Sequence, residues 1–305
     1  RSLTLARDRA GEKPIYYGWQ NKTLLFASEL KSLRVHPEFE GDINREALGL
    51  YLRYGYVPAP FSIYQGINKL LPGTYLTLSL NDVRVLSLPD PIHYWSLLRT
   101  IESGLDNPFL GSENEAVEEL DRLLTTSISS QMVADVPLGA FLSGGIDSTT
   151  VAAIMQKQSR SPIRTFTIGF DESHYNEAIH ASAVAEWLGT NHSELYISPS
   201  DAASIIPKLP QVYDEPFADS SQIPTLLVSD LAKRHVTVSL SGDGADELFG
   251  GYGRYALASG LADKSKYLPL QVRAALSKLF TLTPPALLNI LFRPITYSMA
   301  GSYRN

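Results

Sequence analysis

The chain has 305 residues, of which 44% are hydrophobic and 19% charged, and its formal net charge is −6 at pH 7. This length allows about two domains, and the composition is ordinary for a globular protein. The acidic balance argues against a nucleic-acid surface, and no apolar run approaches the roughly 20 residues that cross a bilayer. The sequence contains no cysteine, which excludes disulfides, thiolate metal sites and a cysteine nucleophile, and favours a cytoplasmic setting.

The first 90 residues or so are rich in tyrosine and predict antiparallel strands. Segments 14–19 and 23–27 are apolar and flank a polar turn, which is typical of a β-hairpin. Asn44 is placed to cap a short helix. Residues 75–88 predict another pair of strands around a central turn. The stretch 89–111 holds several prolines and glycines and is expected to join this domain to the next one.

From residue 112 onward the chain alternates helical and strand-like segments. Ser112 and Glu115 form a capping-box pattern before an amphipathic helix. Strands are predicted at 140–142, 163–170, 195–197 and 236–240. Helices are predicted from residue 148, at 176–188, 201–209 and 221–234, and over most of 260–305. Such alternation predicts a parallel sheet with helices on both faces.

The sequence S-G-G-I-D-S at Ser143–Ser148 lies between a predicted strand and a predicted helix. A glycine turn in this position presents unpaired backbone N–H groups and the positive end of the helix dipole. The serine hydroxyls can donate to oxygens, and Asp147 can bind a hard cation. Such a turn can also simply cap a helix, but an acidic residue inside an anion site is hard to explain without a cation. We therefore expect a site for a phosphate chain with its metal ion.

Two more loops with glycine and acidic residues follow predicted strands, G-F-D-E-S at 169–173 and S-G-D-G-A-D-E at 241–247. In open α/β sheets the ligand crevice lies outside the carboxyl ends of the strands. Asp246 is therefore predicted as a second carboxylate for Mg²⁺, together with Asp147. A flexible acidic surface turn is the alternative for the second loop taken alone. The common nucleotide loop G-x-x-x-x-G-K-[ST] is absent from the chain.

These motifs together resemble a known family. The turn Ser143–Ser148 is similar to the pyrophosphate loop of the ATP pyrophosphatase superfamily, whose members split ATP into AMP and pyrophosphate. Residues 241–252, S-G-D-G-A-D-E-L-F-G-G-Y, resemble the synthetase domain of glutamine-dependent asparagine synthetases. Residues 6–17 and 26–33 resemble late parts of the class II glutaminase domain that precedes it in those enzymes.

The resemblance implies an α/β fold with two domains. Residues 1–95 would be the C-terminal part of an α+β glutaminase domain of the N-terminal-nucleophile type. Residues 96–305 would be a parallel-sheet, nucleotide-binding domain of the adenine nucleotide α-hydrolase-like type. The family's cysteine nucleophile and its downstream lysine are not in this chain, so we expect a fragment truncated at both ends that does not hydrolyse glutamine by the family's route.

The resemblance also assigns residues to roles, with ATP and Mg²⁺ as the cofactors. The pyrophosphate would be bound by Ser143, Gly144, Gly145, Asp147 and Ser148. Adenine would face Leu142 and Ile168, the nucleotide would also contact Ser241 and Gly242, and Mg²⁺ would be held by Asp147 and Asp246. Asp243 is the candidate catalytic residue, for contacts with the acceptor or with ammonia.

The implied reaction is the formation of asparagine from aspartate, ATP and ammonia released from glutamine. Two alternatives stay open: amidation of another carboxylic acid, such as a sugar acid, and a nucleotide-binding fragment without turnover. Residues 213–222 should line the acceptor end of the crevice, although they supply no arginine or lysine. The expected partners are small molecules; no nucleic acid or membrane is expected, and a homodimer stays open.

Overall fold

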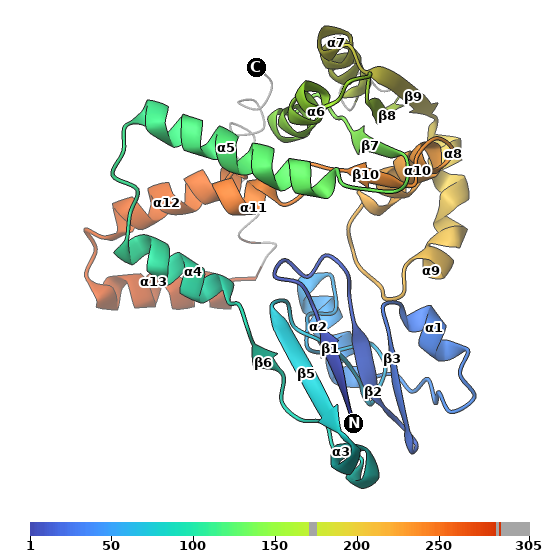
Figure 1. Ribbon diagram of the computed structural model, residues 1–305. Coiled ribbons are helices and arrows are strands. Elements are labelled where there is room, and N and C mark those ends of the chain that lie inside the picture. The colour runs from blue at the N-terminus through green and yellow to red at the C-terminus, as the bar shows by residue number, and fades with distance from the viewer. Residues whose placement is uncertain (171–175, 285–286, 288–305) are drawn as a thin grey trace. The chain divides into compact units, whose positions relative to one another are not determined.

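A computed structural model describes residues 1–170, 176–284 and 287 (Figure 1). Its contacts divide the chain into two compact units, Arg1–Ser241 and Gly242–Asn305. Within the described ranges, all strands belong to the first unit, and the second unit is helical. None of the helices in these ranges combines the length and the apolar character needed to cross a membrane.

The predicted hairpin is confirmed. Strand β2 (Tyr16–Gln20) pairs antiparallel with β3 (Thr23–Ala27), and Asn21 in the turn between them adopts a left-handed backbone with φ of 52°. On its other side β2 pairs antiparallel with β4 (Ile67–Lys69). This sheet and the fully buried Leu30 form one hydrophobic core.

A second antiparallel sheet follows the order β1 (Ser2–Ala6), β5 (Thr74–Ser79), β6 (Ile92–His93). Alternate side chains of β5 point inward, so that Leu76 and Leu78 are buried in a core of their own. The register pairs Leu5 with Leu76, which places apolar side chains of both strands on one face.

The second strand predicted within residues 75–88 is wrong, because that segment forms helix α3 (Leu80–Val85). The hydroxyl of Ser79 accepts a hydrogen bond from the Asp82 amide, and the Asp82 carboxylate accepts one from the Ser79 amide at 2.7 Å. This reciprocal capping box starts a helix directly after β5. The capping pattern was present in the sequence and outweighed the alternation that suggested a strand.

Two further helices support the first sheets, α1 (Leu30–Arg34) and α2 (Arg45–Tyr54). The side chain of Asn44 accepts hydrogen bonds from two amides in the first turn of α2 at 3.0 and 3.1 Å. Gly55 ends α2 with φ of 80°. The predicted cap of this helix is thus confirmed.

The predicted parallel sheet is also confirmed. All of its neighbouring strands run parallel in the order β10-β7-β8-β9, so their carboxyl ends share one edge. Its strands are β7 (Leu138–Phe141), β8 (Arg164–Phe170), β9 (Asn191–Ile197) and β10 (Val238–Leu240). Two helices precede the sheet in the chain, α4 (Leu97–Asp106) and α5 (Glu113–Gln131), and the predicted capping box of Ser112 and Glu115 starts α5.

Helices cover both faces of this sheet. They are α6 (Ile146–Gln158), α7 (Ala178–Leu188) and α10 (Gln222–Lys233). On one face Ala140 and Leu142 are buried with residues of α5, α6 and α7. On the other face Phe166 is buried with Leu231 and Ala232 of α10. Because successive side chains of a strand point to opposite faces, both layers are built from the same short apolar strands.

The remaining described elements are helical. The connection between β9 and α10 contains α8 (Pro199–Ile205), the 3₁₀ turn η1 (Ile206–Lys208) and α9 (Leu209–Val212). The second unit contains α11 (Ala245–Phe249), α12 (Gly253–Ser265) and α13 (Leu270–Leu282). The predicted helical character of residues 260–282 agrees with α12 and α13. Residues 285–286 and 288–305 of this predicted helical segment lie outside the described residues.

Candidate active site

The turn after β7 has the predicted strand-turn-helix form. The amide of Leu142 still bonds to the carbonyl of Phe166 on β8 at 2.9 Å, and the chain then leaves the sheet. Gly144 adopts a left-handed backbone with φ of +81°. Helix α6 begins at Ile146, two residues earlier than predicted, and no side chain caps it at Gly145. The amides of its first turn are therefore left for solvent or for a bound anion.

Two serines fix the shape of this turn. The Ser148 hydroxyl accepts a hydrogen bond from the Ser143 amide at 3.1 Å, and the two hydroxyl oxygens lie 2.9 Å apart. The Ser143 hydroxyl also accepts from the Gly145 amide at 3.2 Å. Ser148 is buried, whereas Gly145 is exposed. The serines therefore hold the turn in shape from its inner side, while Gly145 stays exposed.

Asp147 lies in the first turn of α6 and is partly buried. A carboxylate in this position is stabilised by the helix dipole, and its oxygens suit Mg²⁺. Among the described residues, no group of three or more histidine, aspartate or glutamate side chains is arranged to hold a metal ion. A magnesium ion here would therefore need oxygens from phosphates and water in addition to protein carboxylates, which is its usual form of binding beside a nucleotide.

The other predicted residues of the first unit lie along the same sheet. Leu142 and Ile168 are both buried, at the end of β7 and on β8. Strand β10 is the direct neighbour of β7 and ends at Leu240, so Ser241 follows at the edge where the turn after β7 begins. Residues 171–173 of the predicted loop G-F-D-E-S lie outside the described residues.

Gly242, Asp243 and Asp246 belong to the second compact unit. Gly244 precedes α11 with φ of +89°, and Asp243 is exposed. The Gly251 amide donates to the carbonyl of Asp246 at 3.0 Å, and a β-carbon on Gly251 would collide with the Asp246 carboxylate. Gly251 is thus required for the position of that carboxylate. The glycine pair at 250–251 signalled this in the sequence, but no role was predicted for it.

The structure also contains a groove of about 400 Å³ between α5 and α6. Its walls include Leu120 and Leu124 of α5 and Ala153 and Ile154 of α6. None of the residues predicted for nucleotide or metal binding lines this groove.

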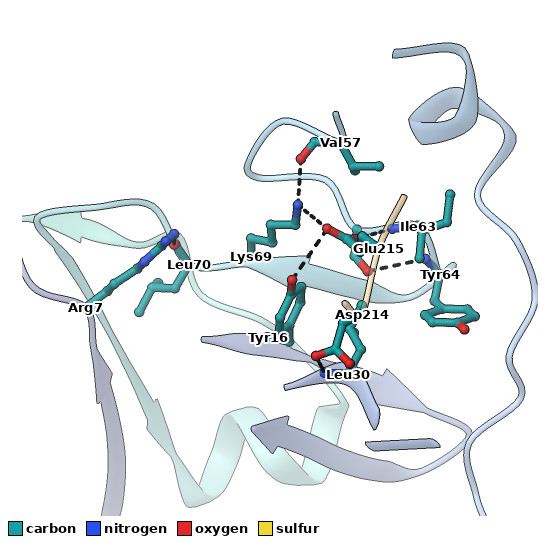
Figure 2. Close-up of polar contacts among 11 residues, drawn as sticks. Arg7, Tyr16, Leu30, Val57, Ile63, Tyr64, Lys69, Leu70, Asp214 and Glu215 are labelled. Atoms are coloured by element: carbon teal, nitrogen blue, oxygen red, sulfur yellow. Dashed lines mark hydrogen bonds and ion pairs between the residues drawn. The ribbon is translucent and has the colours of Figure 1, made fainter. Parts of the chain in front are cut away.

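The loop predicted to line the acceptor end of the crevice has an additional role. Two of its three acidic residues, Asp214 and Glu215, contact residues from the first 70 positions of the chain, as Figure 2 shows. The carboxylates of Asp214 and Glu215 are therefore already engaged within the protein. The prediction that this loop contacts the carboxylate substrate then rests on residues 217–222. No local pattern indicates this contact, because its partners are more than 140 positions away in the chain.

Comparison with known protein families accounts for most of the chain. The profile of the asparagine synthase family matches residues 119–297, and that of a glutamine amidotransferase domain matches residues 1–95. The two matches occur in the order expected from the sequence motifs.

Three curated relatives are similar over most of this chain. A putative glutamine-hydrolysing asparagine synthetase 2 of Methanocaldococcus jannaschii is 38% identical over 250 residues, which are 81% of this chain and 46% of that protein. Asparagine synthetase 1 of Bacillus subtilis is 36% identical over 250 residues, covering 82% and 37%. A putative asparagine synthetase of Mycobacterium tuberculosis is 34% identical over 281 residues, covering 91% and 42%. The chain thus spans less than half the length of each of these relatives.

Proposed function

Because the chain belongs to the asparagine synthase family, we propose that it provides the ATP site for amidation of aspartate, giving asparagine, AMP and pyrophosphate. The observation that carries the proposal is the turn Ser143–Ser148. It places the exposed Gly145 and an uncapped helix N-terminus at the carboxyl edge of a parallel sheet. Such a site suits the phosphates of a nucleotide. The names of the relatives support aspartate as the acceptor over other carboxylic acids.

The proposal keeps the domain division expected from the sequence, with residues 1–95 derived from a glutaminase domain and residues 96–305 from the synthetase domain. The ranges of the two family matches support it. In this view the nitrogen donor is ammonia, which relatives named as glutamine-hydrolysing would take from glutamine.

The proposed chemistry has two steps. An acceptor carboxylate oxygen attacks the α-phosphorus of ATP, and the bond to pyrophosphate breaks. Ammonia then attacks the acyl carbon, AMP leaves, and a proton is lost from nitrogen. In the first step negative charge develops on the oxygens of the departing pyrophosphate, so fixed N–H donors there would lower the barrier.

Individual residues have separate roles in the proposal. Gly144, Gly145 and the start of α6 would bind the pyrophosphate, with Ser143 and Ser148 fixing the turn; the Gly145 amide would exchange its bond to the Ser143 hydroxyl for one to the anion. The side chains of Leu142 and Ile168 are buried, so adenine would meet these residues through their backbone. Ser241 and Gly242 would contact the nucleotide next to this turn, and Asp243 would contact the acceptor or ammonia.

The proposal assigns Mg²⁺ to Asp147 and Asp246, on the strength of the sequence motifs and the family match. Carboxylate oxygens are suitable ligands for this ion, which would neutralise phosphate charge when bound. Gly251 supports the assignment, because it leaves room for the Asp246 carboxylate.

Two measurements test the proposal. Calorimetry should detect binding of Mg-ATP, and an assay with ammonium should detect pyrophosphate release that depends on aspartate. Binding of Mg-ATP without aspartate-dependent release of pyrophosphate would indicate that another carboxylic acid is the substrate. Absence of any Mg-ATP binding would contradict the proposal.

A further inference from the structure

The acidic pair in the loop after α9 connects two parts of the first unit that are distant in sequence. Asp214 lies beside α1, whose N-cap residue Glu29 makes no side-chain capping bond. Instead, the Asp214 carboxylate accepts hydrogen bonds from the amides of Leu30 at 2.7 Å and Lys31 at 3.2 Å. A helix N-terminus is stabilised by such an acceptor and by negative charge. Asp214 thus caps a helix 184 residues away.

Glu215 makes a separate set of contacts (Figure 2). Its carboxylate accepts from the Ile63 amide at 2.8 Å, forms an ion pair with Lys69 and lies 3.5 Å from the Tyr16 hydroxyl. The side chains of Lys69 and Glu215 are only 12% and 10% exposed. Burial and the charge of Glu215 raise the pKa of Tyr16, so this hydroxyl remains a proton donor toward the carboxylate. A buried charge of this kind is stable only while its partners are in place.

Further contacts fasten the backbone on both sides of the pair. The Lys31 ammonium donates to the carbonyl of Val212 at 2.9 Å. The Ala218 amide donates to the carbonyl of Gly55, at the end of α2, at 2.6 Å. The segment 212–218 is therefore fixed to α1, α2 and β4 through side chains and backbone alike.

Residues of the loop also contact one another. The Tyr213 hydroxyl donates to the carbonyl of Gln222 at 3.0 Å, and the Tyr213 ring packs edge-on against Phe217 with centroids 4.8 Å apart. Gln222 begins α10, which packs on Phe166 of the parallel sheet. The loop is thus held from one end by the sheet that carries the proposed ATP site and from the other by residues 16–69.

We propose that Asp214 and Glu215 are positioning residues. Together they form what we call the Asp214–Glu215 clasp, which sets the orientation of residues 217–222 toward the carboxylate substrate. This inference rests on the proposed function and on the expectation from the sequence that residues 213–222 line the end of the crevice that binds the carboxylate substrate. The proposed Mg-ATP site is the turn after β7, and the clasp is not part of it. Loss of the clasp should therefore weaken acceptor binding much more than nucleotide binding.

Amide hydrogen exchange tests the clasp independently of catalysis. Asp214→Ala removes the acceptor for two amides, so exchange at Leu30 and Lys31 should become about fivefold to tenfold faster. The two amides bond to different carboxylate oxygens, so Asp214→Asn, with one side-chain oxygen, should keep the protection at Leu30, which has the shorter bond, and lose it at Lys31. Glu119→Gln, which removes a carboxylate from an exposed pair with Arg122 on α5, is the matched control and should change neither amide.

Steady-state kinetics test the positioning role. In Asp214→Ala the KM for aspartate should rise about tenfold, while the KM for Mg-ATP changes less than about twofold, because misplacing a binding loop lowers the fraction of productive geometry. Asp214→Asn, which can keep only one of the two amide bonds, should give an aspartate KM between those of the parent and Asp214→Ala. Glu215→Gln removes the charge that pairs with Lys69 but keeps the shape, and it should act in the same direction.

The outcomes separate this inference from the proposed function. Unchanged exchange at Leu30 and Lys31 in Asp214→Ala would refute the clasp. Faster exchange with an unchanged aspartate KM would refute the positioning role. If the parent protein releases no pyrophosphate from Mg-ATP, the proposed function fails together with the positioning role, while the exchange result still decides whether the clasp exists.

Discussion

A β-carbon on Gly144 would lie 2.7 Å from the β-carbon of His180, in the first turn of α7. It would also lie 2.8 Å from the amide nitrogen of Ala181, which cannot move without moving the helix. Side-chain β-carbons essentially never approach so closely, and the φ of +81° at Gly144 adds strain for any other residue. The turn after β7 is thus packed directly on the backbone of the next helix.

Gly144→Ala should therefore lower the free energy of unfolding by about 2–4 kcal/mol, the sum of left-handed strain and overpacking. Urea denaturation measures this change. Gly49→Ala is the matched control, because Gly49 lies in α2 with nothing within 4 Å of an added β-carbon. That variant should gain about 0.5–1 kcal/mol from helix propensity. A Gly144→Ala protein as stable as the parent would contradict the packing argument.

Asp147→Asn tests the proposed metal role. The substitution removes the carboxylate charge and keeps the shape of the side chain, so the affinity for Mg-ATP should fall at least about tenfold. Calorimetry with Mg-ATP measures the affinity, and thermal unfolding shows whether the fold is intact. Asp230→Asn, at an exposed position of α10, should leave the affinity unchanged. Equal affinities for the parent and Asp147→Asn would exclude Asp147 as a ligand.

His192 should make the stability depend on pH. Its Nδ1 lies 2.8 Å from the buried Thr165 hydroxyl, and burial lowers its pKa below the ordinary 6.5, against the opposing effect of Glu194. The unfolded chain therefore binds this proton more tightly than the folded one. The contribution of His192 is present above pH 6.5 and is lost as the pH falls through the lower pKa of the folded state.

Urea denaturation from pH 7 to pH 5 measures this effect. The free energy of unfolding should fall over this range, and His192→Gln should reduce the slope. His93→Gln removes an exposed histidine on β6 and should leave the slope as it is in the parent. Equal slopes for the parent and His192→Gln would contradict the prediction.

Asn44→Ala should destabilise the protein by about 1 kcal/mol, because two amides of α2 lose the side-chain oxygen that accepts from them. Asn44→Asp retains an acceptor at the same place and should be close to the parent. Both values come from urea denaturation. A loss equal in the two variants would show that the capping oxygen is not the cause.

Local patterns in the sequence were sufficient for much of the fold and for the turn of the candidate site. The capping residues Asn44 and Ser112, the glycines at 144–145 and the alternation of strands with helices act within a few positions of the chain. These features follow from backbone geometry and hydrogen bonding between near neighbours. The prediction of a strand after β5 was wrong because another local feature, the capping box of Ser79 and Asp82, starts a helix there.

The sequence by itself thus determined many of the elements, the parallel sheet and the motif residues that follow its strands, but not α3, β6 or α4. Only the tertiary structure decided that Asp214 caps α1, that Glu215 pairs with Lys69, and that the Gly144 backbone lies on α7. In each case the partners are separated by tens to nearly two hundred residues, and no periodicity or local propensity encodes such a pairing. It arises because a buried carboxylate or a close backbone contact is stable only where the folded chain supplies the matching group.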